Sequence, residues 1–394
     1  MNYHVILKDK YFSRYIEDIY ELGLESENVF WVQGDEEATD LFSTNRPVVY
    51  LGKDKAQWVE KFKQIQPGDK LIVSWYSTAL GEAILKAKVK APLYVCYMGG
   101  DLYIEPKAWH AGWLFDDLTK NRLNEIGYLP NPSFFLRGAA QKSLIKRLKT
   151  PFHYCRWKCS RYVSYKRKLK TVERIDYITV SEIEYKFLKK LYPTINAKTL
   201  KGIWDQNFDL AASMPYHEHS GEMYDVQIGN SADPSNNYID AFRCVKENLH
   251  YNYNVHCFLS YAIYAGNDWI IDAGKQYFGD RFVPVVGFMQ RKEYMDYINN
   301  IDVLVMYHNR QQAYGNIATA LVLGKPVFMK ASNVVYQRLK SMGIVPLYDV
   351  ATLGDVPLEE RIEEAKLHRE ETSNILRQLH AKEVRLKNWM DIIG

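Results

Sequence analysis

Short apolar runs alternate with longer amphipathic segments along most of the chain. In the first half, the apolar runs have the length of buried strands and end at polar turns. These runs are His4–Lys8, Val29–Val32, Val48–Leu51, Leu71–Trp75, Leu93–Met98 and Tyr177–Val180. The segments with helical spacing are Tyr11–Leu24, Lys55–Ile65, Thr78–Lys88 and Glu182–Leu191. Strands that alternate with helices predict parallel βαβ units in a doubly wound sheet.

The same alternation returns after residue 224. Its apolar runs are Val226–Ile228, Val255–Leu259, Phe282–Val286, Val303–Tyr307 and Pro326–Met329. Helical spacing marks Tyr238–Asn248, Trp269–Phe278, Lys292–Asn299 and Ile317–Leu323, and the charged, periodic residues 358–393 follow as one long or two shorter helices. The chain is therefore predicted to be α/β, with two Rossmann-like, doubly wound parallel-sheet domains facing each other across a cleft.

Domain limits follow from the places where this alternation stops. Residues 207–223 lack clear periodicity and contain Pro215, His217, His219 and Gly221, so we interpret them as a linker with solvated histidines. The predicted domains are 1–206, with a basic helical segment at 137–170, then 224–357, then C-terminal helices at 358–394.

Composition places the chain among soluble globular proteins. Its 394 residues can bury two cores, and 47% of them are hydrophobic and 25% charged. Nowhere does the sequence contain the roughly 18 consecutive apolar residues of a membrane span. A strand pattern occupies the N-terminus in place of a signal peptide, and five cysteines without framework spacing favour reduced thiols. These features predict a cytoplasmic protein.

Charge is unevenly distributed. The segment 137–170 carries twelve Lys and Arg and no acidic residue, although the net charge of the whole chain is only +4. Aromatic residues lie among these charges at Phe152, Tyr154, Trp157, Tyr162 and Tyr165. An anionic membrane surface and a solvated basic helix face both account for the pattern. Nucleic acid is a weaker alternative, so we predict no nucleic-acid partner.

One strand-to-helix junction stands out as a candidate ligand site. The apolar run Val226–Ile228 stops at Gly229, and the polar turn 230–235 precedes the helix Tyr238–Asn248. The N-terminus of a helix offers unpaired N–H groups and a partial positive charge, which suit phosphate. The alternative is an empty junction of the kind that every α/β protein contains.

A second polar loop, 307–316, connects the run Val303–Met306 to the helix Ile317–Leu323. It suits a diphosphate, with Arg310 or an amide side chain as an additional donor. In the alternative interpretation the loop is solvated and Asn316 merely caps the helix.

Several common motifs are missing. The sequence has no G-x-G-x-x-G after the first strand, no G-x-x-x-x-G-K-[ST] and no D-x-D triplet. His153, Cys155 and Cys159 have no second ligand pair at the spacing of a zinc site. We therefore predict no metal site and no cofactor.

Four motifs resemble glycosyltransferase family 56. The segment from Gly229 to Asn236 resembles that family's G-N-S-x-D-x-S-N loop, and Gly99–Tyr103 resembles its G-A-D-L-Y. Arg310-Gln311-Gln312 with Gly315 resembles R-Q-Q-x-x-G, and Gly324-Lys325-Pro326 resembles G-x-P. The motifs keep the family's order over about 230 residues. The chain departs from the pattern at Gly100, where the family has Ala, and at Tyr314, where it has a branched apolar residue.

The resemblance implies a GT-B fold and a bacterial surface-polysaccharide enzyme. It implies transfer, with inversion and without an essential metal, from a dTDP-linked sugar to a polyprenyl-diphosphate-linked saccharide. The sugar would be similar to 4-acetamido-4,6-dideoxygalactose. Such an acceptor implies that the protein associates peripherally with the cytoplasmic face of the inner membrane, through segment 137–170.

The resemblance also assigns site residues. The donor would be bound by Asn230, Ser231, Asp233, Ser235, Asn236, Arg310, Gln311, Gln312, Gly315 and Asn316. The acceptor side would contain Gly99, Gly100 and Tyr103. Asp101 would be the catalytic base, facing the donor site from the other domain. Glu105 is the rival base, and in a further alternative Asp101 only bonds its own turn.

Two functions of other kinds remain open at this point. A nucleotide-sugar epimerase of the same architecture needs neither a lipid acceptor nor a membrane. A binding module would hold the nucleotide without turnover. A transferase that uses another nucleotide sugar or acceptor is the nearest alternative.

Overall fold

The computed structural model describes residues 1–36, 42–52, 54–103, 111–129, 149–262 and 265–394. Contacts divide the chain into two compact units, each discontinuous in sequence. Unit 1 consists of Met1–His110, Ser160–Gln206 and Leu379–Gly394, and unit 2 consists of Ala111–Cys159 and Asn207–Gln378. The domain limits predicted above follow the order of elements along the chain, whereas these units follow contacts, so those limits stay a prediction.

Unit 1 is built on a sheet of seven parallel strands among its described residues. The strands are β1 (Asn2–Leu7), β2 (Asn28–Gln33), β3 (Val49–Leu51), β4 (Lys70–Ser74), β5 (Leu93–Cys96), β6 (Tyr177–Thr179) and β7 (Lys198–Leu200). Their order is β3-β2-β1-β4-β5-β6-β7, so the chain winds outward from β1 in both directions, as predicted. β7 was not predicted, because its three residues, Lys-Thr-Leu, lack an apolar run.

Helices of unit 1 cover this sheet with their apolar faces. They are α1 (Lys10–Glu21), α2 (Lys55–Phe62), α3 (Thr78–Ala87), α4 (Gly100–Tyr103), α10 (Glu182–Leu191), α19 (Lys382–Ile393) and the second half of α9 (Thr150–Val172). In α1, Phe12, Ile16 and Ile19 recur at helical spacing and are fully buried. Trp389 of α19 packs in the same core, so the last helix of the chain belongs to unit 1.

Unit 2 is built on six parallel strands among its described residues. The strands are β8 (Tyr224–Ile228), β9 (Tyr253–Phe258), β10 (Phe282–Val285), β11 (Val303–Met306), β12 (Val327–Met329) and β13 (Leu347–Asp349). Their order is β10-β9-β8-β11-β12-β13. The order in which successive strands are added to the sheet thus reverses between the parallel neighbours β8 and β11. Parallel sheets bind ligands at such a point, beyond the carboxyl ends of the strands.

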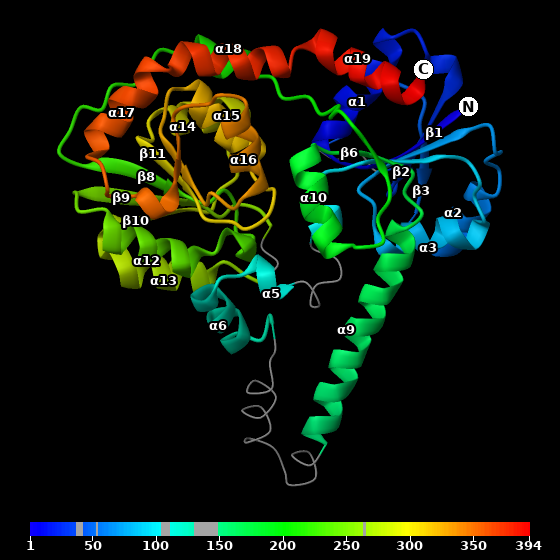
Figure 1. Cartoon of the computed structure of the whole chain (residues 1–394), viewed down its shortest axis with the longest axis horizontal. Helices are drawn as coiled ribbons and strands as arrows, with labels where there is room; N and C mark the ends of the chain where they lie inside the picture. Colours follow the sequence, from blue (N-terminus) through cyan, green and yellow to red (C-terminus); the bar gives the residue numbers. More distant parts are fainter. Residues whose placement is uncertain (37–41, 53, 104–110, 130–148, 263–264) are drawn as a thin grey trace. The chain divides into compact units, whose positions relative to one another are not determined.

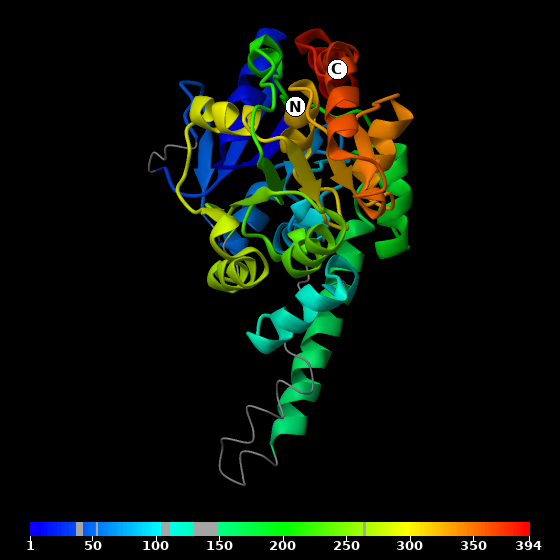
Figure 2. The same ribbon diagram turned by 90° about the vertical axis from the view of Figure 1, so that its left-hand side faces the viewer.

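Helices lie on both faces of this second sheet (Figures 1 and 2). They are α12 (Tyr238–Asn248) and α13 (Asp268–Phe278) on one face, and α14 (Arg291–Asn299), α15 (Tyr314–Val322) and α16 (Val334–Ser341) on the other. Unit 2 also contains α5 (Ala111–Leu114), α6 (Asp117–Glu125), α11 (Asp209–Ser213), α17 (Leu358–Leu367) and α18 (Arg369–Leu379). The charged segment at the end of the chain therefore forms three helices, where one or two were expected.

The predicted linker is fastened to unit 2. Its backbone carbonyls at Met214, Pro215 and His217 accept hydrogen bonds from Arg369, Asn299 and Lys325. His219 stacks on Tyr224 with ring centroids 4.1 Å apart, and its Nδ1 lies 3.1 Å from an Asp302 carboxylate oxygen. The expectation that His219 is solvated was therefore wrong. The cause is tertiary: Asp302 lies 83 residues away in sequence.

Candidate functional site

The two candidate loops lie side by side at one edge of the unit 2 sheet. One follows β8 and the other follows β11, and these strands pair directly, with Ile228 opposite Val305. The carboxyl ends of parallel strands share one edge, so residues 229–237 and 307–313 extend from neighbouring positions. Gly229 adopts a φ of +69°, and the Tyr238 hydroxyl lies so close that a Cβ there would clash. Glycine is therefore required at this turn.

A buried polar network joins the two loops. Gln312 Nε2 donates to Asn230 Oδ1 at 2.9 Å, and Gln312 Oε1 lies 2.7 Å from the Ser235 hydroxyl. Arg310 donates through Nε to Ser235 and through Nη2 to Asp233, at 3.2 and 3.3 Å. All five residues are at most 8% exposed. The network holds both loops in one conformation, because breaking it would leave buried polar groups without partners.

The remaining predicted residues of the first loop are positioned by the loop itself. The amide of Asn236 donates to the backbone oxygens of Ser231 and Asp233. Asn236 is fully buried, and its Oδ1 has no partner among the described residues. Ser231 Oγ accepts from the Asp233 N–H at 3.3 Å.

Helix α15 begins without a side-chain cap. Ala313 occupies the N-cap position with a φ of +57° and supplies no capping side chain. Gly315 and Asn316 lie in the first turn, where N–H groups have no partner inside the helix. Asn316 does not cap the helix, as the alternative interpretation supposed, because its amide donates to the Tyr294 hydroxyl. The nine-residue helix therefore directs a partial positive charge to the edge that carries Arg310.

The N-terminus of α12 differs from the prediction. Its Ile239 N–H donates to Thr119 Oγ1 of α6, at 3.2 Å. In return, the Asp240 carboxylate accepts from the N–H groups of Leu118 and Thr119, at 3.1 and 2.8 Å. The two helices cap each other, so the start of α12 is not the free anion site that the sequence predicted. Neither helix is capped by its own N-cap side chain, but the first turn of α12 bonds to Thr119 of α6.

Sequence reasoning missed a second set of polar residues at this edge. Lys330, after β12, pairs with Asp116 and donates to Asn309 at 2.6 Å, and Asp116 accepts from Asn309 at 2.9 Å. Asn333 is fully buried and donates to the backbone oxygens of His308 and Arg310, each at 2.9 Å. These residues hold the second loop in place through hydrogen bonds to His308, Asn309 and Arg310. A polar side chain directly after a strand, as at Lys330, was the available signal.

The candidate acceptor-side turn belongs to unit 1. Gly99 has a φ of +98°, and Gly100 and Asp101 begin α4. Asp101 is 2% exposed, and its carboxylate accepts from the backbone N–H groups of Tyr76 and Met98, both at 3.3 Å. Burial raises its pKa to about 6, against the opposing effect of Lys168. Tyr103 is also buried and donates to Glu184 at 3.0 Å. Glu105 lies outside the described residues.

Helix α9 carries the described part of the basic segment. It is one continuous helix whose last turns contact α3 (Figure 1). Lys168 is fully buried and donates to the backbone oxygens of Tyr76 and Asp101, at 2.8 and 3.0 Å. Arg167 pairs with Glu82 of α3. In the described part of the segment, Arg167 and Lys168 are thus engaged by other residues of unit 1, whereas Lys166 and Lys170 are exposed.

No helix in the described parts of the chain is long and apolar enough to cross a membrane. The same residues hold no group of three His, Cys, Asp or Glu side chains arranged like metal ligands.

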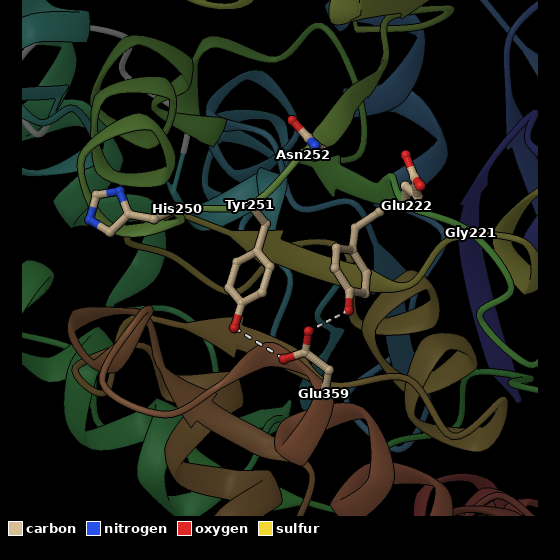
Figure 3. Close-up of a pocket in the computed structure, with 7 residues that line it drawn as sticks. Gly221, Glu222, His250, Tyr251, Asn252 and Glu359 are labelled. Atoms are coloured by element: carbon tan, nitrogen blue, oxygen red, sulfur yellow. Dashed lines mark hydrogen bonds between the residues drawn. The ribbon is translucent and has the colours of Figure 1, made fainter.

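A pocket of about 530 Å³ lies at the opposite edge of the unit 2 sheet (Figure 3). There Glu359 accepts hydrogen bonds from the hydroxyls of Tyr224 and Tyr251, at 2.8 and 3.1 Å. Tyr224 opens β8 and Tyr251 precedes β9, so the pocket faces the amino ends of the strands. It is separate from the candidate site.

Comparison with solved structures identifies the fold. A sucrose-phosphate synthase from Thermosynechococcus elongatus aligns with a TM-score of 0.57 and 12% sequence identity. The alignment covers 99% of this chain and 98% of the synthase chain. A glycosyltransferase from Rickettsia africae aligns with a TM-score of 0.56 and 7% sequence identity, over 100% of this chain and 97% of its own. A UDP-forming α,α-trehalose-phosphate synthase from Burkholderia xenovorans aligns with a TM-score of 0.55 and 9% sequence identity, and the alignment covers 100% of both chains. The prediction of two parallel-sheet domains in a GT-B fold with C-terminal helices is confirmed.

Sequence comparison identifies the family. No curated protein sequence matches the chain. The family model described as 4-alpha-L-fucosyltransferase, glycosyl transferase group 56, matches residues 162–374, which is more than half of the chain. This span contains both loops of unit 2 and the network between them. An epimerase and a pure binding module are thereby set aside. The protein is a glycosyltransferase, and it belongs to glycosyltransferase group 56.

Proposed function

We propose that the protein transfers a deoxy-amino sugar from a dTDP-sugar to a polyprenyl-diphosphate-linked saccharide, with inversion and without a metal. The sugar is similar to 4-acetamido-4,6-dideoxygalactose, and the product enters a bacterial surface glycan. The uncapped start of α15 beside Arg310 carries this proposal. The family description names fucosyl transfer, which also concerns a 6-deoxy sugar.

The chemistry of the leaving group fits this edge of the sheet. Transfer breaks the bond between the anomeric carbon and the donor diphosphate, which departs with the electron pair. Arg310 and the N–H groups of Gly315 and Asn316 would bind this negative charge as it develops. In this role Asn230, Ser231, Asp233, Ser235, Asn236, Gln311 and Gln312 bind the donor or hold its loops.

The acceptor hydroxyl must lose a proton as its oxygen attacks. We assign this proton to the Asp101 carboxylate, on the turn that contains Gly99, Gly100 and Tyr103. A pKa of about 6 leaves the carboxylate ionised at neutral pH and able to accept the proton. Attack from the face opposite the diphosphate inverts the anomeric carbon.

Incubation with dTDP-sugars and UDP-sugars tests the proposed function. Release of free nucleotide only when a lipid-linked saccharide is present would support it, and dTDP-linked donors are expected to react fastest. Faster turnover with UDP-sugars would overturn the proposed donor. A water-soluble acceptor used equally well would overturn the proposed acceptor.

Transfer is expected to persist in excess EDTA. Arg310 and the first turn of α15 supply the positive potential that a bound metal supplies in other transferases. Initial rates should be measured with and without the chelator, beside a metal-dependent transferase as a control. Complete loss of activity that Mg²⁺ or Mn²⁺ restores would contradict this prediction.

The lipid-linked acceptor predicts binding to anionic membrane surfaces through α9. Replacing the exposed Arg156, Lys158, Lys166 and Lys170 with Gln is expected to weaken binding to anionic vesicles by about tenfold or more, since each well-placed cation contributes up to about 1 kcal/mol. Added salt should weaken wild-type binding in the same direction. Co-sedimentation measures both effects.

Lys168→Gln provides the matched control, because Lys168 is buried. It is expected to lower the melting temperature and to leave vesicle binding unchanged. Equal binding of the wild type to neutral and anionic vesicles would show that the basic face is merely solvated.

A further inference from the structure

Three large apolar side chains are exposed at the carboxyl edge of the unit 2 sheet. Tyr261 follows β9 and is 51% exposed, while Val286 and Phe288 follow β10 and are 54% and 71% exposed. β9 and β10 are neighbours, with Phe258 opposite Val285. Each aromatic residue comes three positions after one of these paired residues, so the two rings extend from adjacent strand ends.

Tyr261 is tied directly to the first loop of the candidate site. Its hydroxyl accepts from Asn230 Nδ2 at 2.9 Å, and its backbone oxygen accepts from the Ala232 N–H, also at 2.9 Å. Burial of the hydroxyl raises its pKa, so this end of the side chain stays a neutral phenol. The side chain is therefore fixed at its polar end, while the residue as a whole is 51% exposed.

The exposed side chains lie at the same edge of the sheet as the proposed diphosphate site, toward β10. The strand order β10-β9-β8-β11 places Phe288, then Tyr261, then the Asn230 loop, then Arg310 along the sheet. Gly287, between Val286 and Phe288, leaves open space where a side chain would stand. Exposed aromatic and aliphatic side chains after β9 and β10 thus lie next to a site suited to a diphosphate.

We propose that Tyr261, Val286 and Phe288 form the surface on which the donor's nucleobase stacks. This inference rests on the proposed function, because it requires the diphosphate to bind beside Arg310 and α15. It adds to that function the residues that would bind the base of the nucleoside diphosphate sugar. Every base has a flat π-face, so stacking explains affinity for a nucleotide without selecting which one.

The test compares thymidine diphosphate with inorganic pyrophosphate as probes of the full-length protein. Phe288→Ala is expected to weaken thymidine diphosphate binding by roughly tenfold or more, the range found when a stacking aromatic is removed. Pyrophosphate has no base, so its affinity should not change. Calorimetric titration measures both dissociation constants. With the donor sugar, the same variant should raise KM and leave kcat near its original value.

Leu367→Ala is the matched control, since Leu367 is an apolar residue of unit 2 that is 80% exposed on α17. It should change neither dissociation constant. An unchanged affinity for thymidine diphosphate in Phe288→Ala overturns the stacking surface and leaves the proposed function standing. An equal loss for both probes also overturns it. If the unaltered protein binds no nucleotide, the proposed donor site fails and this inference fails with it.

Discussion

Replacing Asp101 with asparagine is expected to lower kcat by about 10²–10⁴-fold while donor affinity stays the same, because a general base contributes about that factor. The wild type supplies an independent measurement. Since the pKa of Asp101 is about 6, the carboxylate is ionised at pH 7 and protonated at pH 5. The value of kcat should therefore fall as the pH is lowered through 6, and Asp101→Asn should lose this dependence.

Asp176→Asn is the matched control, because Asp176 also accepts a backbone N–H, that of Leu93, at 2.8 Å. It lies at the amino end of its strands, and its loss should cost stability without lowering kcat. If Asp101→Asn keeps near-normal turnover and Glu105→Gln loses it, the base is Glu105. If both variants turn over normally, Asp101 only holds its turn through the Met98 N–H.

The fold could be predicted because its strands are continuous apolar runs. In β11, Val303–Met306, all four residues are apolar and buried. A continuous apolar run of this length predicts a strand that is covered on both faces. The strand β13 was missed because Leu347–Asp349 has only three residues and ends in a charge. The packing of α19 on unit 1 could not be predicted, since it depends on Arg385 meeting Asp18, 367 residues away.

The candidate site could be predicted only where local sequence determines it. Polar residues after β8 and β11 predicted the two loops. Their proximity follows because neighbouring parallel strands have their carboxyl ends at one edge of the sheet. The capping of α12 by α6 had no local signal, as Thr119 and Ile239 are 120 residues apart. Lys168 likewise looked like one more charge in a basic run, and only its tertiary partners at Tyr76 and Asp101 distinguish it from Lys166 and Lys170.

Replacing Arg310 with alanine is expected to lower kcat/KM for the donor by about 10²–10³-fold, the usual effect of removing one donor that stabilises developing negative charge. Arg310 lies in the loop between β11 and the uncapped start of α15, where the departing diphosphate is proposed to bind. Steady-state kinetics measures the effect. Arg281→Ala, at the amino end of β10, removes an exposed guanidinium from the same unit and should leave kcat/KM unchanged.

Arg310 also pairs with the buried Asp233, so a loss of activity alone does not separate catalysis from folding. Removing one partner of a buried pair leaves an uncompensated charge and destabilises the protein. The double variant Arg310→Ala, Asp233→Asn removes that charge as well. If Arg310 only neutralises Asp233, the double variant should regain both its melting temperature and its activity. If Arg310 binds the diphosphate, stability should recover and kcat/KM should stay well below that of Asp233→Asn alone, which is the result expected here.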